Sequence, residues 1–294
     1  MTRLRPHIAA RFQSIWAAIL GSLLASVGAH AAAQTYPLRP VRLVAPFPAG
    51  GSNDLVSRTI AQKLGERWPH QMIVDNRPGA GGNLGAEIVA HATADGYTLL
   101  MGSSSLAVNA TLYPKLSFNA RTAFTAITLI GSSVHVLCVN PTVPAQTVKE
   151  LIELAKAKPG QLNYASGGAG SPLHMNAELF SMPFVKNGRL RAIGVTTAKR
   201  IPALPDVPAV GETVKSYDVT NWHGLIGPKA LARPLVDRLN GEVTKIIQQK
   251  DMVEKLEADG VSPAGGSPED FAQVIAREIP QWQKVATEAK VKVE

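Results

Sequence analysis

The chain has 294 residues, of which 45% are hydrophobic and 18% are charged, and its formal net charge is +8. This composition excludes an intrinsically disordered chain, and the length is sufficient for two domains. The single cysteine, Cys138, excludes an internal disulfide framework and a cysteine-based zinc site. The positive charge does not indicate nucleic-acid binding, because lysine and arginine are dispersed rather than interleaved with aromatic residues.

Residues 1–33 have the organisation of a secretory signal peptide. Three arginines precede a short apolar run at 15–25, and small residues follow at 29–33. An N-terminal membrane anchor is the weaker alternative, because the run is short and interrupted by glycine and serine. No cysteine stands at the cleavage site, which argues against a lipid anchor. We therefore predict that the mature chain begins at residue 34, carries a net charge of about +5 once three arginines are removed, and is exported to the periplasm.

The mature chain opens with the pattern of a strand, a helix and a second strand. Residues 41–45 form a short β-rich run, and a glycine turn follows at 48–52. Apolar residues then recur at every fourth position, at Val56, Ile60 and Leu64, which is typical of a helix. Residues 72–74 are the next predicted strand. This spacing indicates a right-handed βαβ unit and therefore a parallel sheet.

The same alternation continues along the chain and places it in the α/β class. From Pro234 onward the chain is mainly helical. The remaining predicted elements are, in order, a helix at 85–92, strands at 97–101 and 134–139, a helix at 148–157, a strand at 162–165, a helix at 174–181 and a strand at 190–195.

Three turns rich in glycine and serine each follow a predicted strand and open a helix, at 50–53, 102–105 and 166–171. Ligands of open α/β sheets bind beyond the carboxyl ends of the strands. Free N–H groups at a helix N-terminus favour an anion, so a carboxylate can be held there without lysine or arginine. The alternative is that these are ordinary turns, in which glycine supplies a positive φ and serine or asparagine caps the helix.

Enzyme motifs are largely missing from the sequence. The stretch at 79–84 begins like a dinucleotide-binding fingerprint but ends in Leu84, and residues 102–106 lack the closing glycine of a nucleophile elbow. His174, near a predicted helix start, is more typical of a cap or a packed residue than of a base. Cys138 lies in an apolar strand and is interpreted as core. We therefore expect no catalytic residues, no metal and no cofactor.

Stretches along nearly the whole mature chain are similar to one family. They include residues 46–54 with Arg58, residues 76–85, which are the most specific, and residues 95–100. The segments 166–180, 188–192, 203–208 and 222–225 are also similar, although His223 stands where an aromatic residue is commoner. On these stretches the chain resembles the extracytoplasmic solute-binding proteins of tripartite tricarboxylate transporters, the Bug family.

The resemblance implies a two-lobed periplasmic-binding-protein fold of type II, with a mainly parallel sheet flanked by helices in each lobe. It assigns residues 34–131 and 225–294 to the first lobe and residues 132–224 to the second. It further implies a monomeric receptor that is not an enzyme, does not bind nucleic acid, and passes a small carboxylated solute to membrane permease subunits.

Family ligand contacts, carried over by position, fall on turns of both lobes. Asp54 is expected to cap its helix or to bind an ammonium group or water, and Asn76, Arg77 and Asp95 are expected to brace loops. The implied first-lobe contacts are Phe47, Ala49, Gly50, Gly51, Ser52, Asn53, Asp54, Ser103, Ser104 and Asn109, and the second-lobe contacts are Ser166, Gly167, Ala169, Gly170, Ser171 and His174.

One departure from the family pattern falls at Met182–Pro183. In the family a strand, a loop of the Pro-Tyr-Lys-Gly type, a helix and another strand precede the stretch that resembles 183–188. Here they are missing, which by ordinary element lengths amounts to roughly 40 residues. A thin second lobe follows from this gap, because loss of internal strands exposes core and leaves backbone groups unpaired. The alternative function is therefore a degenerate or regulatory relative with impaired ligand binding, and an exported enzyme is the weaker third possibility.

Overall fold

The computed structural model describes residues 36–113, 115–163, 189–201 and 204–288. The predicted signal peptide, the predicted helix at 174–181 and half of the predicted strand at 162–165 lie outside these ranges. Within them, no helix combines the length and the apolar character needed to cross a membrane.

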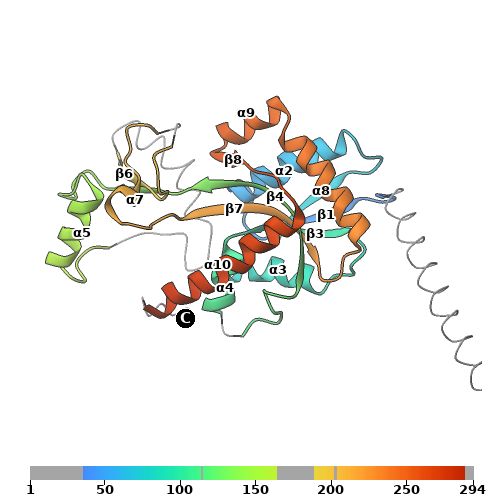
Figure 1. Ribbon diagram of the computed structural model, residues 1–294, viewed down its shortest axis with the longest axis horizontal. Helices are drawn as coiled ribbons and strands as arrows, with labels where there is room; N and C mark the ends of the chain where they lie inside the picture. Colours follow the sequence, from blue (N-terminus) through green and yellow to red (C-terminus); the bar gives the residue numbers. More distant parts are fainter. Residues whose placement is uncertain (1–35, 114, 164–188, 202–203, 289–294) are drawn as a thin grey trace, which may run out of the picture.

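A six-stranded sheet forms the larger part of the described structure, which we call the first lobe (Figure 1). Its strands stand in the order β2-β1-β3-β7-β4-β8. Strand β1 runs parallel to β2 and β3, and every other neighbouring pair is antiparallel. The strands are β1 (Val41–Ala45), β2 (Met72–Asn76), β3 (Thr98–Ser103), β4 (Phe124–Val134), β7 (Thr220–Pro228) and β8 (Val261–Pro263).

The sheet is therefore mixed, and the expected parallel pairing is confined to its first three strands. Helices α2 (Ser52–Gly65) and α3 (Asn83–Ala90) return the chain between these strands, which produces the predicted parallel arrangement. Strand β7 arrives instead from the distant part of the chain and enters between β3 and β4 in the opposite direction. Sequence analysis did not predict β7, because eight of its nine residues are buried and it has no polar–apolar alternation.

Two separate hydrophobic clusters cover the two faces of this sheet, as the alternation along β3 shows: Leu99 belongs to one cluster and Leu100 to the other. Helices α2, α8 (Arg233–Ile247) and α9 (Lys250–Ala258) contribute to the Leu99 cluster. Helices α3, α4 (Ser105–Leu112) and α10 (Pro268–Glu288) contribute to the Leu100 cluster. The prediction of a mainly helical C-terminal region is thus confirmed.

The aromatic ring of Phe271, in α10, lies directly on strand β7. A Cβ atom at Gly224 would come within 2.1 Å of this ring, so only glycine permits the contact. The same ring packs edge-on against Trp222, with the ring centroids 5.1 Å apart. Helix α10 is therefore held against the middle of the sheet by an aromatic pair.

A smaller unit, which we call the second lobe, is joined to the first by the continuous strands β4 and β7 (Figure 1). Its described part has an antiparallel pair, β5 (Val136–Val139) and β6 (Arg191–Val195), with helices α5 (Val148–Ala157) and α7 (Val210–Thr213). The two-lobed α/β architecture is confirmed, although the described strands of this lobe are antiparallel because β6 returns beside β5. The predicted lobe boundaries at 131/132 and 224/225 fall inside β4 and β7 and stay predictions.

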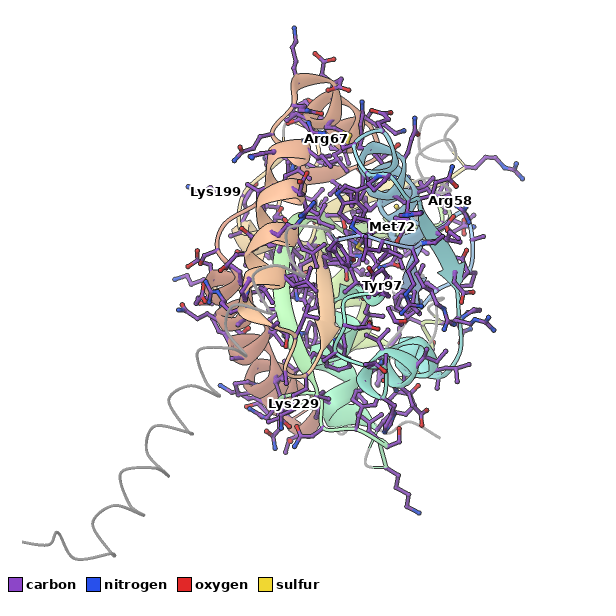
Figure 2. All side chains as sticks on the ribbon, turned by 90° about the vertical axis from the view of Figure 1, so that its right-hand side faces the viewer. Arg58, Arg67, Met72, Tyr97, Lys199 and Lys229 are labelled. Atoms are coloured by element: carbon purple, nitrogen blue, oxygen red, sulfur yellow. The ribbon has the colours of Figure 1, made fainter. Side chains whose placement is uncertain are left out.

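Charged side chains are spread around the outside of the described structure (Figure 2). Lys199 and Lys229 are exposed and lie far apart, whereas Met72 lies in the dense interior. These two lysines therefore contribute positive charge to separate parts of the described surface, in agreement with the dispersal of lysine and arginine along the sequence.

Candidate functional site

The first predicted ligand loop connects the end of β1 to the start of α2. Gly51 is the N-cap residue of α2, and no side chain caps the helix there. Because the first N–H groups of a helix lack intrahelical partners and carry partial positive charge, this helix start suits an anion. Gly51, Ser52 and Asn53 are all buried at this position, whereas Ala49 and Gly50 are exposed. The Asn53 amide is anchored to the sheet, since its Nδ2 donates to the Met101 carbonyl at 3.0 Å.

The buried carboxylate of Asp54 braces this loop through hydrogen bonds. Its Oδ2 accepts from the Gly50 N–H at 2.9 Å and from Arg58 Nε at 3.0 Å. Its Oδ1 accepts from Asn76 Nδ2 at 2.9 Å, and that same Nδ2 lies 3.1 Å from the Phe47 carbonyl. Burial would raise the pKa of Asp54, but the hydrogen bonds from Arg58, Gly50 and Asn76 outweigh it and lower this pKa. Both carboxylate oxygens of Asp54 thus already accept hydrogen bonds from within the protein.

The family-specific stretch at 76–85 packs beneath the same loop. It contains the short 3-10 helix η1 (Ala80–Gly82), and Gly82 has a φ of 96°. A Cβ atom at Gly82 would lie 2.8 Å from the Phe47 ring, so glycine is required by conformation and by space. Asn109, predicted as a ligand contact, is 1% exposed and donates to the Gly81 carbonyl at 2.7 Å. The structure therefore gives Asn109 a loop-bracing contact.

The serine turn after β3 lies beside this stretch. Ser103 and Ser105 form a hydrogen bond between their hydroxyls at 2.7 Å, and the hydroxyl of Ser104 donates to Asn221 Oδ1. Ser103 and Ser105 also line a small recess with Pro46, Gly82, Asn83 and Asn109. The structure therefore brings the first-lobe loops together at one edge of the sheet, and a solute would have to share or displace the hydrogen bonds of these hydroxyls.

Strand β7 adds two polar residues to this edge that sequence reasoning did not assign to the site. The Nε2 atom of His223 lies 3.3 Å from Asn221 Nδ2 and 3.3 Å from the hydroxyl of Ser133, in β4. Full burial and, to a lesser extent, the nearby imidazole of His135 together lower the pKa of His223 to about 4. The available signal was a polar pair at positions i and i+2, which share one face of a strand.

The six predicted second-lobe contacts lie outside the described residues, so their placement stays a prediction. They are Ser166, Gly167, Ala169, Gly170, Ser171 and His174. Across the described ranges, no group of three or more histidine, cysteine, aspartate or glutamate side chains is arranged to hold a metal ion.

The fold and the polar edge of the sheet are those of a two-lobed solute-binding protein, and the sequence identifies the family. Residues 56–183 and 180–291 match the tripartite tricarboxylate transporter family receptor. The chain belongs to this family. Protein BugT from Bordetella pertussis is 30% identical, over 94% of this chain and 98% of its own. A protein encoded in the tcbD-tcbE intergenic region of Pseudomonas sp. strain P51 is 32% identical, over 87% and 88%.

Solved structures of similar proteins are solute-binding receptors. R. palustris Rpa4515 with adipate is 30% identical, with a TM-score of 0.79 over 87% of this chain and 99% of that one. The periplasmic binding protein BugD is 26% identical, with a TM-score of 0.78 over 88% and 100%. MatC from Rhodopseudomonas palustris, with bound malate, is 26% identical, with a TM-score of 0.76 over 85% and 99%. The receptors in this family and among these neighbours are periplasmic, which agrees with the predicted export.

Proposed function

We propose that this chain is a periplasmic receptor that captures a small carboxylated solute between its lobes for a secondary transporter of the tripartite tricarboxylate type. The observation that carries the proposal is the uncapped start of α2, at Gly51, beside the serine turn that ends β3. The relatives that hold adipate and malate support a carboxylate as the ligand.

The first-lobe loops offer the chemistry that a carboxylate needs. Backbone N–H groups at the start of α2 are neutral donors that strengthen when the acceptor is an anion. The hydroxyls of Ser103 and Ser104 add polar atoms that a solute hydroxyl or a bridging water can bond. The negative charge of Asp54 is balanced by Arg58, so it repels an incoming carboxylate less than a free carboxylate would. A receptor that releases its solute benefits from such neutral donors, because they hold an anion without a permanent buried ion pair.

Lobe closure supplies the mechanism. Strands β4 and β7 are the two described connections between the lobes (Figure 1). A ligand that touches both lobes binds the closed state better than the open one and therefore shifts the population toward closure. We propose that the closed form is the one that the membrane subunits recognise, and that the receptor acts as a monomer.

A degenerate receptor with weak or no binding is the second candidate. It is supported by the family match, which falls into two pieces that meet at 180–183. The alignment with BugT spans 318 residues but takes up 94% of this 294-residue chain, which is about 276 residues. A difference of about 40 positions is the size of the strand–helix–strand segment predicted to be missing from the second lobe.

A thermal-shift screen of the mature chain, followed by calorimetry on each hit, separates the two candidates. Adipate, malate and citrate are the first ligands, and adipamide and malamide are matched neutral controls. The receptor proposal expects a clear rise of the unfolding midpoint with at least one carboxylate and none with its amide, because binding to the native state stabilises it. A flat response to a wide panel of mono-, di- and tricarboxylates would favour the degenerate receptor.

A further inference from the structure

A hydrogen-bonded cluster joins the serine turn of the first lobe to both strands that lead into the second. Ser104, at the end of β3, bonds to Asn221 in β7 across 117 positions of sequence. The hydroxyl of Ser133, in β4, lies 3.2 Å from the Asn221 carbonyl and 3.3 Å from His223 Nε2. These four residues are buried and polar at the position where the sheet changes from lobe to connection.

The direction of the hydrogen bonds fixes the state of each partner. Because Ser104 donates to Asn221 Oδ1, the other end of the amide, Nδ2, faces His223. An amide nitrogen only donates, so Nε2 of His223 must be the acceptor at 3.3 Å. The imidazole is then neutral with its proton on Nδ1, and this Nδ1 is buried without a hydrogen-bond partner in the described ranges.

We propose that His223 is a positioning residue of the carboxylate site: its Nε2 orients the amide of Asn221, and Asn221 in turn holds the hydroxyl of Ser104 at the cleft end of β3. The inference rests on the proposed function, in which Ser104 is a ligand contact. It adds a residue pair on the connecting strands to a site predicted from turns alone. The proton of Ser104 points to Asn221, so its lone pairs can accept from a solute hydroxyl or from a water that in turn donates to the carboxylate. The gain is preorganisation, since an acceptor already held in one direction loses less freedom when the solute binds.

The surroundings of His223 keep its imidazole neutral. Its register partners on β3 and β4 are Ser103 and Gly131, which carry no charge. The one acidic group in the first turn of α2, Asp54, is bound to Gly50, Arg58 and Asn76. The titratable group that acts on His223 is His135, whose charge opposes protonation. Protonation would place an N–H donor against the Asn221 donor and break the cluster.

A matched pair of substitutions tests the inference. His223→Phe keeps a ring of similar size but removes the acceptor, and His223→Gln places an oxygen acceptor where Nε2 lies. With a carboxylate that binds the wild type, we expect affinity to fall about tenfold in His223→Phe and to stay within about threefold in His223→Gln. Equal affinity of His223→Phe and wild type, with both folded, would overturn the inference.

The pH profile gives a readout that a purely structural role would not move. The ratio of wild-type affinity to His223→Gln affinity cancels the protonation of the ligand itself. We expect this ratio to fall as pH decreases from 6 toward 4, because only the wild type carries an imidazole that protonates there. A ratio that is constant over this range would contradict a neutral acceptor at position 223.

Nitrogen-correlated NMR of the ligand-free protein tests the contact between His223 and Asn221 independently of whether a carboxylate binds. The expected signals are an Nδ1–H tautomer of His223 at neutral pH and Asn221 side-chain amide protons that shift in His223→Phe far more than in His223→Gln. Loss of the amide signals in Asn221→Asp assigns them. If no carboxylate binds the wild type, the proposed function fails, and an Nε2–H tautomer or unmoved Asn221 signals would still overturn the orienting contact.

Discussion

The two lobes differ in how completely their helices bury an apolar face. In the first lobe, the face of α8 is buried along its whole length, with residues Leu235, Val236, Leu239, Val243, Ile246 and Ile247. In the second lobe, α5 is similarly amphipathic, yet Val148 is its one buried residue. Half-buried leucine and isoleucine side chains on α5 stabilise less, because the hydrophobic contribution scales with the area removed from water.

This difference in burial suggests that the two lobes have different roles, one in stability and one in closure. The first lobe has a sheet covered on both faces and carries the first-lobe half of the predicted site, where hydrogen bonds brace the loops after β1 and β3 and the stretch at 76–85. The described part of the second lobe is a two-stranded sheet with lightly buried helices. We therefore expect stability to reside mainly in the first lobe and the second lobe to serve closure.

The largest expected effect is a cavity in the first lobe. Leu99→Ala removes a fully buried side chain from the centre of β3, and we expect a loss of about 2–5 kcal/mol in the free energy of unfolding. Leu154→Ala, in α5, is the matched second-lobe variant and should cost under about 1 kcal/mol, because its side chain is only partly buried. Urea denaturation measures both. Similar losses of unfolding free energy in the two variants would contradict the expected difference in stability between the lobes.

The next effect concerns the buried carboxyl group of Glu278, in the first lobe, whose charged form is disfavoured by burial. Glu278, in α10, accepts from Trp222 Nε1 at 2.8 Å, and burial raises its pKa to about 7. Between about pH 4.5 and 7 the unfolded state has released this proton and the folded state has kept it, so stability falls as pH rises through that window, by up to about 3 kcal/mol.

Glu278→Gln should remove this slope, because glutamine is neutral in both states. The control is Glu254→Gln, at an exposed residue that pairs with Lys250, which should leave the slope unchanged. Denaturant titrations at a series of pH values measure it. A slope that persists in Glu278→Gln would show that Glu278 is not its source.

A smaller effect is expected at the loop brace. Asp54→Asn keeps the size of the side chain but loses the charge that holds Arg58 and the Gly50 N–H, at an expected cost of about 1–3 kcal/mol. The folded-state pKa is lowered, so the contribution is present above the unfolded pKa of about 4 and is lost as pH falls through the lowered value. Asp251→Asn, which breaks an exposed ion pair with Lys63, is the control and should leave the unfolding midpoint unchanged.

The smallest expected effect separates folding from binding at the start of α2. Gly51 has a φ of −81°, a backbone conformation that any residue adopts, and aspartate is a good N-cap residue. Gly51→Asp should therefore fold normally but lower carboxylate affinity about tenfold through charge repulsion. Gly51→Asn is the neutral control of equal size. Calorimetry that finds the two variants equal would place the carboxylate elsewhere.

Elements in both lobes were predictable where their signals are local. The strand at 41–45 and the helix at 148–157 have the bounds that the structure shows, since each depends on apolar periodicity and on nearby breakers. The loop-bracing roles of Asn76 and Asp95 are confirmed, as Asn76 donates to Phe47 and Asp54, and Asp95 accepts from the Tyr97 N–H.

The sequence by itself determined the α/β class, the family and the turns that follow β1 and β3, because periodicity and turn residues act over short distances. Only the tertiary structure decided that β7 enters the sheet antiparallel between β3 and β4, that Asn221 reaches Ser104, and that His223 pairs with Ser103. Those contacts join residues more than a hundred positions apart. The physical reason is that burial on both faces erases the alternation of a central strand, and that a hydrogen bond depends on position in space and leaves no periodic trace in the chain.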